Sequence, residues 1–448
     1  MMKIKTMDRL GKIGLLFLGV FFVTACSFLK HKEKKDIITN KEAANYVQIA
    51  TGQLSSYGVD GELMNGVKAG DALFGQDGYY LKGQVMSYRK NGDGTVSDLN
   101  SNLMWQEIPT EEGFDWQGAK DYCENLKLGG YDDWRLPSAK ELFSITDFNA
   151  GWPYIDLNYF SLVDNVHIDK SEQYWSSNKY VGHTEEGGFN AAFGVNFATG
   201  HIKAYPAAAP SNRRQGKHRP GGTPPPPANE TGRLKGTSSS NEQGPRNGTP
   251  PPPVANGRPQ GNPMLKHVRA VRGDVYGLNN FVDNGDSTIT DISSGLMWSK
   301  NDSEMGLNWP DALAYAENSD LAGYRDWRLP NIKELQGIVE YNYAPGAKDP
   351  KLDRPAINPV FHCSEIINEN GDKDYPYFWS STSARFQKGK PYYYAWYVSF
   401  GRAVNKNGLD FHGAGAVRFD TKHENGPAGE GGERFYNYVR LVRELHSK

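Results

Sequence analysis

The feature that most constrains this chain is a stretch of sequence that it contains twice. Gly-Tyr-Asp-Asp-Trp-Arg-Leu-Pro occupies Gly130–Pro137, Gly-Tyr-Arg-Asp-Trp-Arg-Leu-Pro occupies Gly323–Pro330, and Lys-Glu-Leu follows each copy. Upstream residues keep the same spacing, for example Trp105 with Trp298. Chance matches do not stay in register over such a stretch, so the chain contains one domain in two copies.

Composition indicates what kind of domain is repeated. Hydrophobic residues make up only 38% of the 448 residues, aromatic residues reach 12%, and there are 50 Gly and 26 Pro. This mixture favours loop-rich, mostly β modules with aromatic cores over helical bundles. The formal net charge of −2 gives no reason to expect a nucleic-acid partner.

The N-terminus has the pattern of an export signal. Lysines and an arginine precede the apolar run Ile13–Val23, which is too short to span a bilayer comfortably. The run leads into Val-Thr-Ala-Cys, which resembles a bacterial lipobox ending at Cys26. This resemblance implies cleavage after residue 25, acylation of Cys26 and a membrane anchor, and Ser27 favours the outer membrane of the cell envelope. The alternative is a plain signal peptide or signal anchor in which the cysteine is a coincidence. Residues 26–70 are expected to be a tether.

Local patterns predict the elements of each copy. We expect a strand at Tyr79–Val85 and a hairpin turn at Asn91–Asp98. The alternating Asp and Asn oxygens of this turn also suit calcium, so calcium binding stays open as an alternative. Asp115 is a candidate N-cap for a helix that ends near Asn125. Ser138-x-x-Glu141 has the spacing of a capping box and predicts a second helix.

The repeated motif lies between these two helices, and its arginine has two interpretations. Arg135 either braces the junction between the helices through a carboxylate or carbonyl oxygens, which we favour, or it binds a ligand. Further along, Tyr-Trp-Ser-Ser at Tyr174–Ser177 and Phe-Trp-Ser-Ser at Phe378–Ser381 predict equivalent strands.

A Pro-rich segment interrupts the first copy. Residues 206–263 contain 14 of the 26 prolines and cannot bury a core, so they are expected to be disordered. His-Val-Arg-Ala-Val-Arg-Gly at His267–Gly273 matches Tyr-Val-Arg-Leu-Val-Arg-Glu at Tyr438–Glu444, which closes the second copy. The segment is therefore an insertion before the last strand of the first domain. We expect the first domain at residues 71–273 and the second at 274–448.

The ordered motifs resemble the Lcl C-terminal domain family. They are Asn-Gly-Asp-[Gly/Ser]-Thr, Leu-Met-Trp, Gly-Tyr-x-Asp-Trp-Arg-Leu-Pro-x-x-Lys-Glu-Leu, [Tyr/Phe]-Trp-Ser-Ser and [His/Tyr]-Val-Arg-x-Val-Arg. The resemblance implies an α+β fold made of two tandem C-type lectin-like domains, each with two short helices, small antiparallel sheets and paired first and last strands. Family members often join the first helix to the closing strand by a disulfide. Here Cys123 faces Ala270, so that bridge cannot form, and Cys123 and Cys363 are expected to be single thiols.

The resemblance and the anchor together suggest a non-catalytic binding protein. We expect two modules that recognise a glycan or a polyanionic surface polymer, as in adhesion; the alternative is a structural or assembly subunit that binds an envelope protein. Candidate ligand-binding residues are aromatic or basic side chains in loops: Tyr392, Tyr393, Tyr394, Arg213, Arg214, Lys217 and Arg219. Trp396 is assigned to a core strand instead.

An enzyme is the third hypothesis, and the sequence gives it little support. Oxidases related to C-type lectin-like domains depend on a cysteine pair, which neither copy contains. No ordered nucleophile and base, His cluster with metal spacing or Gly-rich phosphate loop is present, so we expect no cofactor and no metal.

Overall fold

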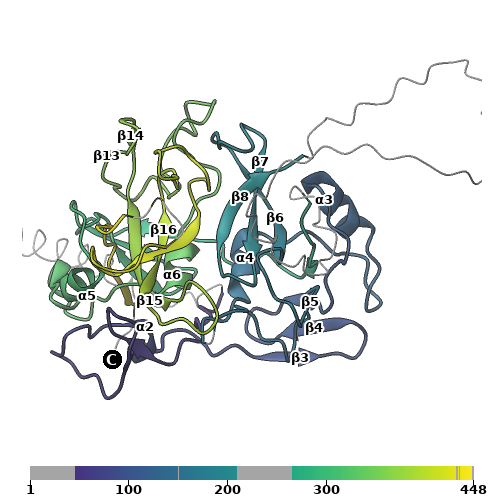
Figure 1. Cartoon of the computed structure of the whole chain (residues 1–448), viewed down its shortest axis with the longest axis horizontal. Coiled ribbons are helices and arrows are strands. Elements are labelled where there is room, and N and C mark those ends of the chain that lie inside the picture. Colours follow the sequence, from purple (N-terminus) through teal and green to yellow (C-terminus); the bar gives the residue numbers. More distant parts are fainter. Residues whose placement is uncertain (1–45, 150, 209–264, 430–431, 433, 446–448) are drawn as a thin grey trace, which may run out of the picture.

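The computed structural model describes residues 46–149, 151–208, 265–429, 432 and 434–445. The predicted signal, Cys26 and nearly all of the Pro-rich insertion lie outside these residues. Figure 1 shows two lobes side by side, with the strands of the two copies meeting in the middle. The architecture is α+β, with small antiparallel sheets, short helices and many loops.

Both copies contain a four-stranded antiparallel sheet, two helices and a three-stranded antiparallel unit, in that order of appearance. In the first copy these are β3 (Tyr88–Lys90), β4 (Thr95–Asp98), β5 (Met104–Gln106), α3 (Trp116–Asn125), α4 (Ala139–Ser144), β6 (Gln173–Tyr180), β7 (Ala191–Asn196), β8 (Ile202–Pro206) and the closing strand β9 (Val271–Arg272).

The second copy repeats this order and adds a short hairpin. Its elements are β10 (Phe281–Asp283), β11 (Thr288–Asp291), β12 (Leu296–Ser299), α5 (Trp309–Glu317), the 3₁₀ turn η1 (Leu321–Gly323), α6 (Ile332–Gly337), β13 (Ile366–Ile367), β14 (Lys373–Asp374), β15 (Tyr377–Ala384), β16 (Tyr394–Ser399), β17 (Val417–Thr421) and the closing strand β18 (Val442–Glu444).

The predicted turns and caps are confirmed. The Asp93 carboxylate accepts hydrogen bonds from the backbone N–H and the hydroxyl of Thr95, so the acidic turn between β3 and β4 uses its own oxygens. Asp115 caps α3 by accepting from the Gly118 N–H at 2.8 Å. Capping boxes begin both α4 and α6. The closing strands pair with β5 and β12, as the family resemblance implies.

The two copies share one sheet through equivalent strands. Its order is β15-β16-β17-β8-β7-β6, and β17 joins β8 antiparallel with Val417 opposite Ile202. The helices α4 and α6 also contact each other. Each of these elements contacts its equivalent in the other copy, as happens when two copies are related by a two-fold axis. The duplicated domains therefore form one folded body.

The N-terminal segment, residues 46–86, lies against this body and corrects the predicted tether over residues 46–70. It contains β1 (Ser56–Tyr57), β2 (Leu63–Met64) and α2 (Asp77–Tyr80). Figure 1 shows it beneath the second copy, near the C-terminus. The strand expected at 79–85 is wrong, because its first residues form the end of α2 and the rest is irregular apart from a bridge at Gln84.

Side-chain hydrogen bonds attach this segment to β15. The Gln53 amide donates to the Ser383 carbonyl and accepts from the Ser383 N–H, both at 2.9 Å. Asp77 accepts hydrogen bonds from the hydroxyls of Thr51 and Thr382, both at 2.7 Å. These residues are buried, so polar contacts far apart in sequence fix the start of the folded chain.

Aromatic side chains dominate the core, as the composition predicts. The largest fully buried side chains include Trp105, Trp175, Trp298, Trp379 and Trp396. Cys123 is buried and Cys363 half-buried, and neither forms a disulfide, which confirms that they are single thiols.

Candidate functional site

The repeated motif holds the closing strand in place. In the first copy the Asp133 carboxylate accepts two hydrogen bonds from the Arg272 guanidinium, whose Cζ lies 3.7 Å from the centroid of the Tyr131 ring. Asp326, Arg443 and Tyr324 repeat this arrangement in the second copy, with a Cζ-to-centroid distance of 3.9 Å. The tyrosine and the aspartate of the motif therefore contact the arginine of the closing strand within their own domain.

The motif arginine is also structural, which supports the favoured interpretation of Arg135. Its guanidinium donates to both carboxylate oxygens of Glu141, at 2.8 and 2.6 Å, and to the Gly273 carbonyl. Glu141 is the same residue that completes the capping box of α4. Arg328 makes the equivalent two bonds to Glu334, each at 2.7 Å. A planar guanidinium fits a carboxylate in this bidentate way.

The first arginine of each closing segment is fully buried. Arg269 donates to backbone carbonyls of Gln106, Glu107 and Ser161, and Arg440 donates to the equivalent carbonyls of Ser299, Lys300 and His362. The family motifs therefore build the framework. A ligand site is to be sought where the two copies differ.

The tyrosines singled out in the sequence do not form a surface for sugar rings in this structure. Tyr392 and Tyr394 are each 3% exposed, and Tyr393 is half-buried. Tyr392 stacks on Tyr57 of the N-terminal segment with ring centroids 3.8 Å apart, and the Tyr394 hydroxyl donates to a backbone carbonyl. Burial leaves Tyr392 and Tyr394 with packing roles, and Trp396 is in the core as expected. Arg213, Arg214, Lys217 and Arg219 lie outside the described residues.

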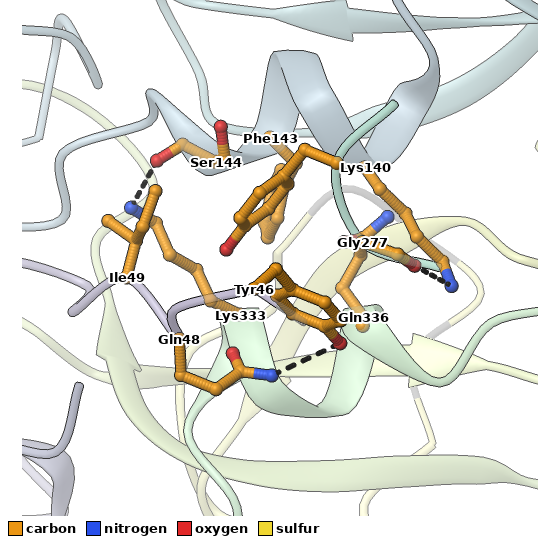
Figure 2. Close-up of a pocket in the computed structure, with 11 residues that line it drawn as sticks. Tyr46, Gln48, Ile49, Lys140, Phe143, Ser144, Gly277, Lys333 and Gln336 are labelled. Atoms are coloured by element: carbon orange, nitrogen blue, oxygen red, sulfur yellow. Dashed lines mark hydrogen bonds between the residues drawn. The ribbon is translucent and has the colours of Figure 1, made fainter. Parts of the chain in front are cut away.

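The motif lysines meet at the junction of the copies, around a small cavity (Figure 2). Lys140 reaches from the first copy to the Gly277 carbonyl and the Asn279 side chain, at 3.1 and 2.7 Å. Lys333 reaches from the second copy to the carbonyls of Ser144 and Ala50, at 2.7 and 2.9 Å. Each lysine therefore braces the copy to which it does not belong.

This cavity is too small for a ligand. Its volume is about 20 Å³, which is room for one water molecule. Burial lowers the pKa of Lys140 to about 8 and that of Lys333 to about 7. Lowered lysine pKa values often mark reactive sites, but here both ammonium groups are occupied by carbonyl oxygens and no substrate can enter. We assign the cavity to the junction between the copies.

A groove of about 540 Å³ runs along one face of α5 in the second copy. Its wall consists of Asp311, Ala314, Tyr315 and Asn318, whose spacing of three and four residues places them on one side of the helix. The opposite side is formed by the β10–β11 turn, the end of β12 and the residues after it, and the floor by Val439 and Leu441 of the closing segment. Ligand sites in proteins commonly have 300–1,000 Å³.

The first copy shows why the second is open. There the Gln106 amide donates to the Tyr122 hydroxyl at 2.8 Å and accepts from the Ala270 N–H, so its side chain crosses the space. The equivalent of Gln106 is Ser299, whose hydroxyl accepts, among the residues that the structure describes, only the corresponding backbone N–H, from Leu441. Tyr315, the counterpart of Tyr122, is 40% exposed and has no hydrogen-bond partner within the described part of the chain.

Further exchanges make the groove polar. The leucine at position 126, which packs against the core of the first copy, is replaced by Ser319, and Ile108 is replaced by Asn301. Lys127 is replaced by Asp320. Burial raises the pKa of Tyr315, and the nearby carboxylates of Asp302 and Glu304 raise it further. The groove thus combines an exposed aromatic ring with hydroxyl, amide and carboxylate groups.

Residues of this groove were missed from the sequence because no motif marks them. The available signal was the loss of bulk at equivalent positions, Gln106 to Ser299 and Leu126 to Ser319. Within the described ranges no group of three or more His, Cys, Asp or Glu residues is placed to hold a metal ion. No helix among those residues is long and apolar enough to cross a membrane.

The structure thus defines a duplicated α+β domain whose shared motifs brace a closing strand and whose copies differ at one groove. The family model described as the Lcl C-terminal domain matches residues 94–215 and 287–443, and the chain belongs to this family. No match was found among curated proteins or solved structures.

Proposed function

We propose that this protein is a non-catalytic binding module that recognises a saccharide through the groove of its second copy. The observation that carries the proposal is the groove itself, because the same position in the first copy is filled by side chains. An exposed tyrosine ring flanked by hydroxyl, amide and carboxylate groups is chemically suited to a sugar, whose apolar ring face packs on an aromatic while its hydroxyls form hydrogen bonds. The two helices, and the closing strand of each copy that pairs with β5 or β12, support a C-type lectin-like fold for each copy.

The cell envelope is the proposed location, through acylation of Cys26. The sequence before Cys26, which resembles a lipobox, supports this acylation. An anchor of several acyl chains would hold the protein stably at a membrane. Metabolic labelling with a fatty acid that is lost in Cys26→Ala would support the anchor, and labelling that persists in this variant would contradict it. Contact of the basic Pro-rich insertion with a polyanion remains a prediction, with a salt-sensitive affinity.

The test uses residues 26–448 with Cys26→Ser, with and without residues 211–263, on a glycan array at two salt concentrations. Binding that resists salt, survives the deletion and is lost in Ser299→Gln supports recognition by the groove. Binding that disappears with residues 211–263 contradicts it and assigns recognition to the basic insertion. If no saccharide binds, the proposal fails, and an assembly role with an envelope protein becomes the better hypothesis.

A further inference from the structure

The charges of the groove narrow the class of saccharide. Asp311 and Asp320 are exposed carboxylates near the two ends of the α5 wall, and Asp302 lies buried behind the opposite side. Asp302 has partners of its own: it accepts from the N–H and hydroxyl of Ser364, and Arg440 lies 3.9 Å away. Asp311 and Asp320 form no ion pair with any described residue. No lysine or arginine from the described part of the chain lines the groove.

Hydrogen-bond donors and acceptors in the groove are also available. Ser299 is 4% exposed, and its hydroxyl accepts the Leu441 N–H, while its own proton has no acceptor among the described residues. The Tyr315 hydroxyl has no counterpart of the glutamine partner that Tyr122 has in the first copy, because Ser299 stands in the equivalent position. A ligand that enters the groove therefore meets two hydroxyl groups without protein acceptors and two carboxylates without protein cations. The wall from Asp311 to Asn318, at about 1.5 Å per residue, is about 10 Å long, which suits an oligosaccharide better than one sugar.

We propose that the groove binds an oligosaccharide of amino sugars whose amines are free and protonated. The ammonium groups pair with Asp311 and Asp320, a sugar ring packs on Tyr315, and sugar hydroxyls accept from Ser299 and Tyr315. An anionic polymer is disfavoured at this site, because its charges would face Asp311 and Asp320, which form no ion pair with any described residue. This inference rests on the proposed function, since it names the ligand class of the same groove.

The experiment compares three tetrasaccharides by calorimetric titration: glucosamine, N-acetylglucosamine and glucuronic acid oligomers. The protein is residues 26–448 with Cys26→Ser, at a pH below the pKa of the sugar amine. We expect the glucosamine oligomer to bind most tightly and the glucuronic acid oligomer not to bind. Asp311→Asn and Asp320→Asn should each weaken the glucosamine oligomer about fivefold, the effect of losing one partly exposed charge pair.

Two variants separate the groove from the rest of the protein. Ser299→Gln installs the side chain that fills the first copy, so it should abolish binding while the unfolding midpoint stays close to that of the parent. Asp121→Asn is the matched control, because Asp121 is exposed on the equivalent helix of the first copy, where it pairs with Gln117. It should leave the affinity unchanged.

The outcomes distinguish the two proposals. Tighter binding of the acetylated oligomer, lost in Ser299→Gln, would overturn the charge inference and leave saccharide recognition by the groove standing. Binding that Ser299→Gln does not alter would overturn the groove as the site. If none of the three oligomers binds and the glycan array is also negative, the proposed function fails and this inference fails with it.

Discussion

Replacing Gln53 by alanine tests whether the N-terminal segment belongs to the folded body. The Gln53 side chain is 2% exposed, and its amide pairs with both backbone groups of Ser383 in β15. Alanine would leave a buried N–H and a buried carbonyl without partners at Ser383, which is 1% exposed. Each buried unpaired group costs about 1–3 kcal/mol, and water that enters the vacated space recovers part of this. We expect Gln53→Ala to lower the free energy of unfolding by about 3 kcal/mol.

The assay combines urea unfolding, followed by tryptophan fluorescence, with hydrogen exchange read by mass spectrometry. In Gln53→Ala the amides of residues 46–86 and of β15 should exchange faster than in the parent, because the hydrogen bonds that join them are lost. Gln48→Ala is the matched control: Gln48 is half-buried, and its side chain donates only to the Tyr46 hydroxyl, at 3.4 Å. Its effect should stay within about 0.5 kcal/mol.

Equal unfolding free energies for the two variants would refute this reasoning. So would unchanged exchange at Ser383, because the amide that Gln53 covers should become exposed first. Either result would mean that residues 46–86 are held by other contacts than those described, or that they act as the tether that the sequence suggested.

Three other predictions concern buried titratable groups. Burial raises the pKa of Asp410 from 3.8 to about 7, so the folded state binds this proton more tightly than the unfolded state; stability should fall as pH rises from about 4 to 7, by at most about 1.4 kcal/mol per pH unit. Asp410→Asn should flatten that slope in unfolding measurements across pH. Burial lowers the pKa of Lys333 from 10.5 to about 7, so stability should rise between those values as the unfolded state loses its proton, and Lys333→Met should remove this rise. Burial raises the pKa of Cys123 to about 12, so a thiol reagent should label Cys123 only after unfolding, and rapid labelling of the native protein would contradict its burial.

Local patterns were the reliable part of the sequence. The caps of α3 and α4 and the hairpin turn before β4 follow from residues that act within a few positions, whereas the pairing of the closing strand was implied by the family resemblance. The role of Arg135 was also correct, because an arginine at a helix entry has a nearby capping glutamate to pair with.

Other features depended on contacts that no local pattern encodes. Gln53 and Ser383 are 330 positions apart, so the packing of the N-terminal segment had no signal at short range. Tyr392 and Tyr394 looked like loop tyrosines, but one is covered by Tyr57 and the other lies in β16, between β15 and β17 in the shared sheet. The groove was visible only as a difference between equivalent positions, such as Gln106 and Ser299, which a search for matching motifs passes over.

The course of residues 46–86 has a mechanical consequence. The segment enters beside Ala50, whose N–H donates to the Gln84 carbonyl, crosses the second copy as far as α2, and returns to the same place before β3. A force applied to the N-terminus therefore acts on the junction between the copies, not on the end of one domain. At this junction Lys333 donates hydrogen bonds to the carbonyls of Ala50 and Ser144. The next contact along the chain is the hydrogen bonding of the Gln53 side chain to Ser383 in β15. When the N-terminus is pulled, we expect residues 46–86 to detach first, while both copies remain folded.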